Sequence, residues 1–259
     1  MRNLIKGLTL DGVAARRGDT IVSVPHQHGL QPMCLGECDT ESPIGAPGLK
    51  LFKIRVADRD GRRRSASVLV QRRYAWRGYQ VDASPDSLPN GATFSAYDAD
   101  VVVATISVGL DSPDGMFVES LFAKEVSAFR APGKKVCEFT KLAVDEALKS
   151  KQVLASIFHI AYIYARRIHA CTDLFVEVNP RHVRFYERML GFRAFGDVRM
   201  DSRVDAPAAL LHLDLAHAEA QISKLGGNPA LGSQVRSLYP YFYSQHEEAG
   251  VRARLRNFD

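Results

Sequence analysis

The chain has 259 residues, 46% of them hydrophobic and 24% charged, which is ordinary for a globular protein and long enough to bury a full core. Its formal net charge of +5 suits an acidic partner such as nucleic acid, an anionic lipid surface or an acidic carrier protein. The longest apolar run, residues 153–165, is too short to span a bilayer, and no charged leader precedes an apolar segment at the start of the sequence. We therefore expect a cytoplasmic protein with at most peripheral membrane contact.

The sequence divides into three parts. Residues 1–48 are rich in Gly, Pro and polar residues without sustained periodicity, which predicts a largely irregular extension. Residues 49–226 form the predicted folded domain, and residues 227–259 form an aromatic and basic tail that is predicted to be helical. Within the domain we predict strands at 51–57, 92–97, 101–108, 136–144, 174–178, 192–200 and 209–215, and helices at 65–79, 117–129, 153–169, 181–190 and 216–225.

Helix 65–79 carries an arginine on its apolar side. Arg73 lies four residues after Leu69 and three before Trp76, so the three side chains share one side of the helix, with Tyr74 beside them. A planar guanidinium there suits a carboxylate, either that of an amino acid or that of Glu138. The alternative is an arginine that extends its charged end into water.

A glutamate interrupts the strand 136–144, whose sequence is VCEFTKLAV. Glu138 and Thr140 share one face at period two, and Lys141 points to the other face unless a bulge turns it. A charged group within a central strand is costly unless it is paired or functional. Glu138 is therefore either a carboxylate that works on a substrate or a solvated residue at the surface of the sheet.

The segment that follows this strand, residues 145–152, contains two acids and no glycine. It lacks the glycine-rich backbone that cradles a pyrophosphate at the start of a helix. This composition argues against tight binding of coenzyme A. Lys149 and Lys151 could instead receive a single phosphate or an acidic protein surface, and we predict them to bind a carrier.

The stretch NPRHVRFYERMLGF, residues 179–192, follows the apolar strand 174–178. Pro180 lies just inside the start of a short helix and Gly191 ends it. Asn179 and Tyr186 are two helical turns apart and can face one cleft. This arrangement resembles the last motif of GNAT acyltransferases, in which the Asn holds the pantetheine arm of the donor and the Tyr protonates the departing thiolate.

Neither cysteine nor histidine spacing indicates a metal site. Cys34 and Cys38 are not followed by a second close pair, and the eight histidines are scattered, so zinc chemistry is not expected. His159, within an apolar helix, is read as a core residue. No nucleic-acid reader motif accompanies the short arginine-rich segments, so no nucleic-acid partner is expected.

Four segments together resemble the bacterial long-chain N-acyl amino acid synthases, which are GNAT-fold relatives of the acyl-homoserine-lactone synthases. They are CEFTKLAVD (137–145), LASIFHIAYIYA (154–165), TDLFVEVNPRHVRFY (172–186) and APAALL (206–211). The resemblance implies an α/β (α+β) GNAT-like fold with a mixed central sheet and splayed central strands. It implies transfer of a long fatty acyl group from acyl carrier protein to the α-amine of an amino acid. The donor would be the acyl-phosphopantetheine of the carrier, with no cofactor bound.

The resemblance also assigns residues. It matches Glu138, Thr140 and Lys141 to a Glu, a Ser/Thr and an Arg of the lactone synthases. A lysine cannot make the bidentate hydrogen bonds that the arginine can. Arg73, Tyr74 and Trp76 occupy, more loosely, a helix with an Arg and aromatic residues.

The resulting mechanistic hypothesis places the thioester between strands 136–144 and 173–178. Backbone N–H groups near Phe139 to Lys141 would stabilise the oxyanion, Glu138 would take a proton from the ammonium, and Tyr186 would protonate the thiolate. The acyl tail would lie beside Ile157, Phe158, Ala161 and Tyr162.

Alternatives remain open. A lactone synthase, a coenzyme A-dependent N-acyltransferase and an inactive carrier-binding module all fit the same motifs. The tail could cover the acyl tunnel, lie on a membrane surface or pack as a C-terminal helix, and the last is the default expectation.

Overall fold

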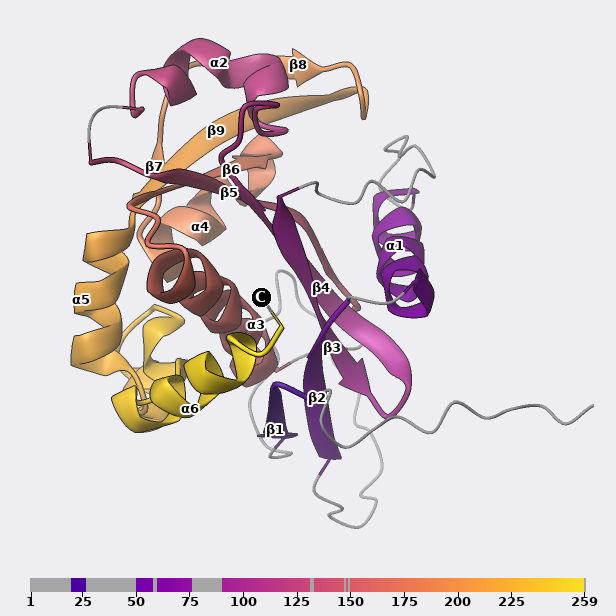
Figure 1. Cartoon of the computed structure of the whole chain (residues 1–259), viewed down its shortest axis with the longest axis vertical. Coiled ribbons are helices and arrows are strands. Elements are labelled where there is room, and N and C mark those ends of the chain that lie inside the picture. The colour runs from indigo at the N-terminus through magenta and orange to yellow at the C-terminus, as the bar shows by residue number, and fades with distance from the viewer. Residues whose placement is uncertain are drawn as a thin grey trace, which may run out of the picture.

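A computed structural model describes residues 20–26, 50–57, 60–75, 90–130, 133–146, 148 and 150–258. Its strands form one mixed sheet in the order β1-β2-β3-β4-β5-β6-β9-β7, with β8 paired to β9 (Figure 1). Their bounds are Val22–His26 (β1), Lys50–Val56 (β2), Gly91–Asp98 (β3), Val101–Leu110 (β4), Val136–Val144 (β5), Asp173–Val178 (β6), Arg193–Ala194 (β7), Arg199–Asp201 (β8) and Ala206–Asp214 (β9). Of the described pairs, β5 and β6 run parallel and the others antiparallel.

Helices cover both faces of this sheet (Figure 1). Their bounds are Asp60–Ala75 (α1), Glu119–Ser127 (α2), Lys151–Tyr162 (α3), Val183–Leu190 (α4), Leu215–Leu225 (α5) and Gln245–Leu255 (α6). Two small apolar clusters join α1 and α2 to the face that carries Val136 and Ala143. The main core lies on the opposite face, where α3, α4, α5 and α6 pack together against the sheet.

The two parallel strands separate halfway along their length. Pairing between β5 and β6 runs from Val136↔Asp173 to Phe139↔Val176. Beyond that point β6 continues along β9 as far as Val178↔Ala209, whereas β5 continues along β4 as far as Val144↔Ala104. Each strand keeps one partner, so its backbone groups on that side remain satisfied while a gap opens between the two strands.

A bulge in β5 lies next to this gap. Ser107↔Thr140 and Thr105↔Ala143 are paired, so two residues of β5, Lys141 and Leu142, oppose the single Ile106 of β4. Lys141 adopts φ +51°, in the left-handed region. A bulge bends its strand and redirects side chains, and here it turns Lys141 toward the α2 side, where its ammonium lies 5.4 Å from the ring centre of Phe117.

Several predicted segments differ from the observed ones, and the single strand expected at 192–200 is divided into the short strands β7 and β8. Residues 22–26, expected to be irregular, form β1 and pair with β2, although their short VSVPH sequence carries little periodicity. Helix α1 begins at Asp60, five residues before the start expected from the sequence. The helix expected to run to residue 169 is α-helical only to Tyr162 and continues as a π-helix over Ile163–Ile168.

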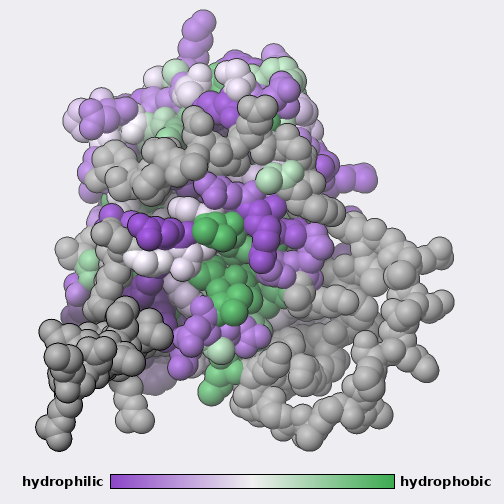
Figure 2. Space-filling model, turned by 90° about the vertical axis from the view of Figure 1, so that its right-hand side faces the viewer, coloured by the Kyte–Doolittle hydropathy of each residue, from purple (hydrophilic) through white to green (hydrophobic). Residues whose placement is uncertain are grey.

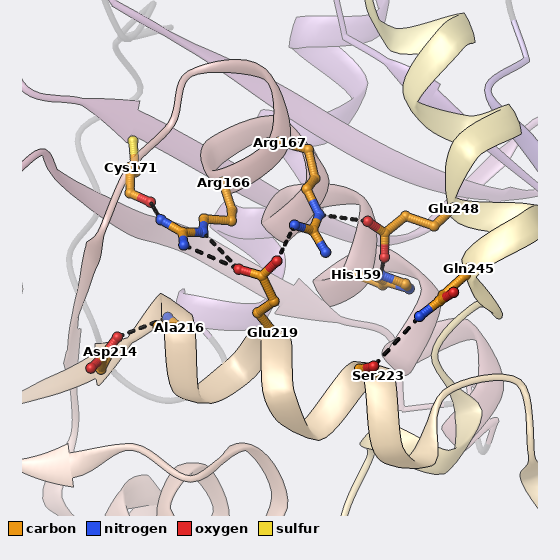
Figure 3. Close-up of polar contacts among 10 residues, drawn as sticks. All are labelled: His159, Arg166, Arg167, Cys171, Asp214, Ala216, Glu219, Ser223, Gln245 and Glu248. Atoms are coloured by element: carbon orange, nitrogen blue, oxygen red, sulfur yellow. Dashed lines mark hydrogen bonds and ion pairs between the residues drawn. The ribbon is translucent and has the colours of Figure 1, made fainter.

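A polar network, buried at His159 and Glu248 and partly exposed at Glu219, joins the C-terminal helices to the π-helix (Figure 3). Arg166 and Arg167 both bind Glu219 of α5, and Nε of Arg167 also donates to Glu248 of α6 at 2.7 Å. Glu248 in turn binds Nε2 of His159 at 3.1 Å. The two arginines of the π-helix thereby form ion pairs with both C-terminal helices, through Glu219 of α5 and Glu248 of α6.

His159 is a structural residue, as the sequence indicated. Its Nδ1 accepts the backbone N–H of Tyr243 at 2.9 Å, so its proton sits on Nε2 and is donated to Glu248. Burial, stronger than the opposing effect of Glu248, lowers the pKa of the imidazole and keeps it neutral. Both ring nitrogens are therefore occupied in holding α6 and the segment before it.

The network predicts a specific loss of stability. Glu248→Ala would leave the buried Nε2–H of His159 without its acceptor, which costs about 1–3 kcal/mol. Chemical denaturation should show that loss, whereas His246→Ala, on the exposed side of the same helix, should unfold like the wild type. Equal stability of the two variants would contradict the role given to Glu248.

Candidate active site

A cavity of about 860 Å³ opens where β5 and β6 separate. Its size falls within the range of roughly 300–1,000 Å³ that is typical of small-ligand sites. Residues of both parting strands line it, together with residues of α1, α4 and the turn after β8. Figure 2, which views the molecule from the side of α1, shows an apolar area bordered by hydrophilic side chains.

One wall of the cavity is a ladder of polar side chains on β3 and β4. The hydroxyl groups of Thr93 and Ser107 lie 2.7 Å apart, and Ser95 donates to Thr105 at 3.4 Å. Thr93, Ser107 and Thr105 line the cavity together with Thr140 of β5. These groups offer hydrogen bonds to a polar substrate on the same face of the sheet as Glu138.

Glu138 is 2% exposed and lines this wall. Its two carboxylate oxygens accept the backbone N–H groups of Phe117 and Val118, each at 2.9 Å, immediately before α2. Burial raises the pKa of Glu138, and the two backbone hydrogen bonds oppose the rise. The glutamate in the strand is thus not solvated at the surface: it holds the start of α2 against the sheet.

Gly109 makes room for this carboxylate. It lies directly across from Glu138 in the β4–β5 ladder. A Cβ at position 109 would stand 2.8 Å from Cγ and from Oε1 of Glu138, closer than side chains tolerate. A glycine opposite Glu138 is therefore required for the observed position of the side chain.

Tyr186 of α4 lines the cavity from the opposite face of the sheet. Its ring makes edge contacts with those of Phe158, Phe185 and Phe192. Burial, aided by the neighbouring Tyr74, raises the pKa of the phenol well above its ordinary value. The phenol is therefore protonated at neutral pH and able to donate a hydrogen bond or a proton.

Asn179 lies at the mouth of the gap, at the end of β6, and also lines the cavity. Its side-chain oxygen accepts the N–H of Arg181 at 3.2 Å, which caps the 3₁₀ turn Pro180–His182 that leads into α4. Its amide donates to the carbonyl of Pro207 at 3.4 Å. Gly191 ends α4 in the left-handed conformation, as expected from the sequence.

The structure brings most of the predicted residues to one cavity. Its lining includes Arg73, Tyr74, Phe139, Thr140, Lys141 and Asn179 as well as Glu138 and Tyr186. Arg73 donates to Glu146 at 2.7 Å rather than to Glu138. Trp76 and Lys149 lie outside the described residues.

Phe158 and Tyr162 are placed elsewhere. They line a separate void of about 20 Å³ between α3, the sheet and the tail, and each is 3% exposed. Their positions on α3 point into the main core because that helix is apolar on nearly every side. The apolar end of the large cavity is formed instead by residues such as Leu148, Leu154 and Phe185.

The C-terminal tail reaches the same cavity. Helix α6 packs on the π-helix, and Phe258, three residues after α6, lines the cavity. The tail therefore packs as a helix and also contributes to the wall. Lys151, at the start of α3, is half-buried and is not among the lining residues.

A charged cluster on the cavity wall was not expected from the sequence. Nη2 of Arg203 lies 3.0 Å from both oxygens of Glu177, and its Nε lies 2.9 Å from Oδ1 of Asp201. All three residues line the cavity. Glu177 is a charged residue within the expected strand 174–178. Period two places it on the same face of β6 as Phe175, which pairs with Glu138 in the structure. Asp201 and Arg203 join it only through the pairing of β8 with β9.

Within the described ranges, no group of three or more His, Cys, Asp or Glu side chains could hold a metal ion. None of the described helices combines the length and apolar character needed to cross a membrane.

A mixed sheet that opens between two parallel strands, over a cavity lined by Glu138, Asn179 and Tyr186, is the architecture of a GNAT-fold acyltransferase. The model of the family described as "FeeM: N-acyl amino acid synthase FeeM" matches residues 65–214. This match covers more than half of the sequence, and the chain belongs to that family of acyltransferases.

The chain is also similar to several solved structures. FeeM, an N-acyl amino acid synthase from uncultured soil microbes, is 28% identical with a TM-score of 0.59, over 65% of this chain and 93% of that one. A putative N-acetyltransferase from Lactobacillus plantarum is 17% identical (TM-score 0.48; 63% and 98% covered). The AHL synthase LasI is 11% identical (TM-score 0.48; 64% and 91% covered). A comparison with curated proteins found no match.

The contact between Gly109 and Glu138 can be tested directly. In Gly109→Ala the new methyl group would displace the carboxylate from Phe117 and Val118, and we expect a stability loss of about 1–3 kcal/mol, as for other overpacked sites. Gly61→Ala is the matched control, because a Cβ there meets nothing within 4 Å and Ala favours a helix. If both variants melt at the wild-type temperature, Glu138 does not depend on Gly109.

Proposed function

We propose that this acyltransferase moves a long-chain fatty acyl group from acyl carrier protein to the α-amine of an amino acid. The observation that carries the proposal is the cavity between the separated ends of β5 and β6. It is polar along β3 and β4 and apolar beside Leu148, Leu154 and Phe185. A thioester lying in the gap would present its carbonyl to the polar side and its apolar parts to the other.

The start of α3 supports a carrier-bound donor over coenzyme A. Ser150 caps this helix with its own side chain, which accepts the N–H of Val153 at 3.3 Å. Asp145 and Glu146, just before it, bind Arg72 and Arg73 of α1. Acidic side chains next to the helix start disfavour a pyrophosphate there, whereas a carrier keeps the single phosphate of its arm near its own surface.

Within this proposal Asn179 holds the pantetheine arm and Tyr186 protonates the departing thiolate. The backbone N–H groups of residues 139–141 stabilise the oxyanion, because the ladder to β6 ends at Phe139. Thr140 and Lys141 face the substrates, and Arg73 and Tyr74 border the acceptor. Lys151, with Lys149, receives the acidic surface of the carrier.

Product analysis tests the reaction. With a long-chain acyl carrier protein thioester and a mixture of amino acids, mass spectrometry should detect N-acyl amino acids, and Tyr186→Phe should form them at least tenfold more slowly. Acyl-CoA at the same concentration should react poorly. Equal rates from both thioesters would overturn the choice of donor, and a lactone formed from S-adenosylmethionine would overturn the choice of acceptor.

The carrier contact predicts a separate effect. Lys151→Glu should raise the KM for the acyl carrier protein several-fold, and the increase should shrink at high salt because rim charges act mainly on association. The amino acid KM should stay the same. Lys224→Glu, on the exposed side of α5, is the matched control, and identical carrier KM values for the two variants would remove Lys151 from the interface.

A further inference from the structure

The cluster of Glu177, Asp201 and Arg203 on the cavity wall has a net negative charge when both carboxylates are ionised. Arg203 bridges the two: its guanidinium contacts both oxygens of Glu177 at 3.0 Å and both oxygens of Asp201 at 2.9 Å. The backbone N–H of Arg203 also donates to Asp201 at 2.9 Å. One guanidinium thus serves two acids, and the remaining negative charge can be balanced by a cation in the cavity.

Burial and hydrogen-bond partners shift the pKa values of the two carboxylates in opposite directions. Burial raises the pKa of Glu177 to about 7, with a further rise from its hydrogen bond to Asp201 and an opposing effect of Arg203. Burial also acts on Asp201, but hydrogen bonds from the side chain and backbone of Arg203 outweigh it and hold the pKa of Asp201 below its ordinary value. Two adjacent acids with separated proton affinities are typical of acid–base sites.

Glu138, the proton acceptor expected from the sequence, is constrained differently. Each of its oxygens already accepts a backbone N–H at 2.9 Å, and only 2% of the residue is exposed. The side chain of Glu177 is 17% exposed, and the guanidinium of Arg203 contacts both of its carboxylate oxygens. Arg203 additionally donates to the carbonyl of Phe117 at 3.2 Å, which ties the cluster to the same loop that Glu138 anchors.

We propose that Glu177 binds the α-ammonium group of the acceptor and takes its proton, and that Asp201 and Arg203 position Glu177. Glu138 then acts as a positioning residue that fixes the wall formed by Phe117 and Val118. This inference rests on the proposed function, since it names the residue that prepares the amine for attack.

The proton balance of the step is complete. The carboxylate of Glu177 takes one proton from the ammonium, and the neutral nitrogen attacks the thioester carbonyl, forming the C–N bond. Collapse of the tetrahedral intermediate breaks the C–S bond, and Tyr186 protonates the leaving thiolate. The second proton lost by nitrogen restores the phenol. The net products are an amide, a thiol and one proton, which Glu177 releases to water.

Other ionisable groups face the same cavity and enter any pH profile. Besides Asp201 and Arg203 they are Arg63, Arg73 and Tyr74 of α1, Glu138 and Lys141 of β5, His182 before α4, and Tyr186 of α4. Burial keeps the phenol of Tyr186 protonated well above neutrality. Substitutions of single residues are therefore needed to identify the group whose titration changes kcat/KM near pH 7.

The test compares pH profiles of purified wild type and Glu177→Gln, using acyl carrier protein thioester and an accepted amino acid. In the wild type kcat/KM should rise with pH through about 7, because Glu177 must lose its proton before it can act. In Glu177→Gln this rise with pH should disappear, and the plateau value of kcat/KM should be about 10²- to 10⁴-fold lower than in the wild type. Glu187→Gln, exposed on α4 beside Tyr186, is the control and should keep the wild-type profile.

A second variant keeps the test decisive if Glu177→Gln folds poorly. Asp201→Asn removes the negative neighbour that raises the proton affinity of Glu177, so the rise in kcat/KM should move to lower pH in an enzyme that still turns over. An unmoved rise in Asp201→Asn, or a wild-type profile in folded Glu177→Gln, overturns the assignment. A wild type that forms no N-acyl amino acid from any acyl thioester overturns the proposed function instead.

Discussion

The site depends on the separation of two strands that begin as a parallel pair. After Phe139↔Val176, β6 remains with β9 and β5 remains with β4. Because each strand keeps its outer ladder, the gap leaves unpaired only the edges that face it, and those edges are where a substrate can be bound. The bulge at Lys141 bends β5 away at this point and turns a cation toward the cavity.

Buried carboxylates around this gap are stable only because each has defined partners. Glu138 accepts two backbone N–H groups before α2, and Asp201 is held by Arg203. An unpaired buried charge would be neutralised by taking up a proton. Burial raises the pKa of Glu177 to about 7, and the guanidinium that opposes this rise is shared with Asp201. Because one guanidinium serves two carboxylates, the cluster keeps the negative charge on which the proposed binding of an ammonium depends.

On the far side of the sheet, a polar network joins the C-terminal helices to the π-helix and α3. There the π-helix carries Arg166 and Arg167 to Glu219, and Glu248 joins His159 to α6 (Figure 3). This network fixes the C-terminal segment whose Phe258 lines the cavity. A segment distant in sequence thereby becomes part of the wall, and the hydrogen bonds of Glu248 to His159 and Arg167 hold the helix before it.

The sequence by itself determined the central elements and the family. Continuous β-branched strands, the Pro-first and Gly-last helix after Asn179, and the segments around Glu138 and Tyr186 are local signals, and local propensity and side-chain period express them directly. The tertiary structure decided the rest. Strand β1 needed β2 as a template, and the contacts of Glu138 depend on Gly109 and on α2. Phe158 faces the core because α3 is packed on several sides. Asp201 and Arg203 meet Glu177 only through the pairing of β8 with β9, since contacts between residues far apart in sequence leave no periodic trace in either segment.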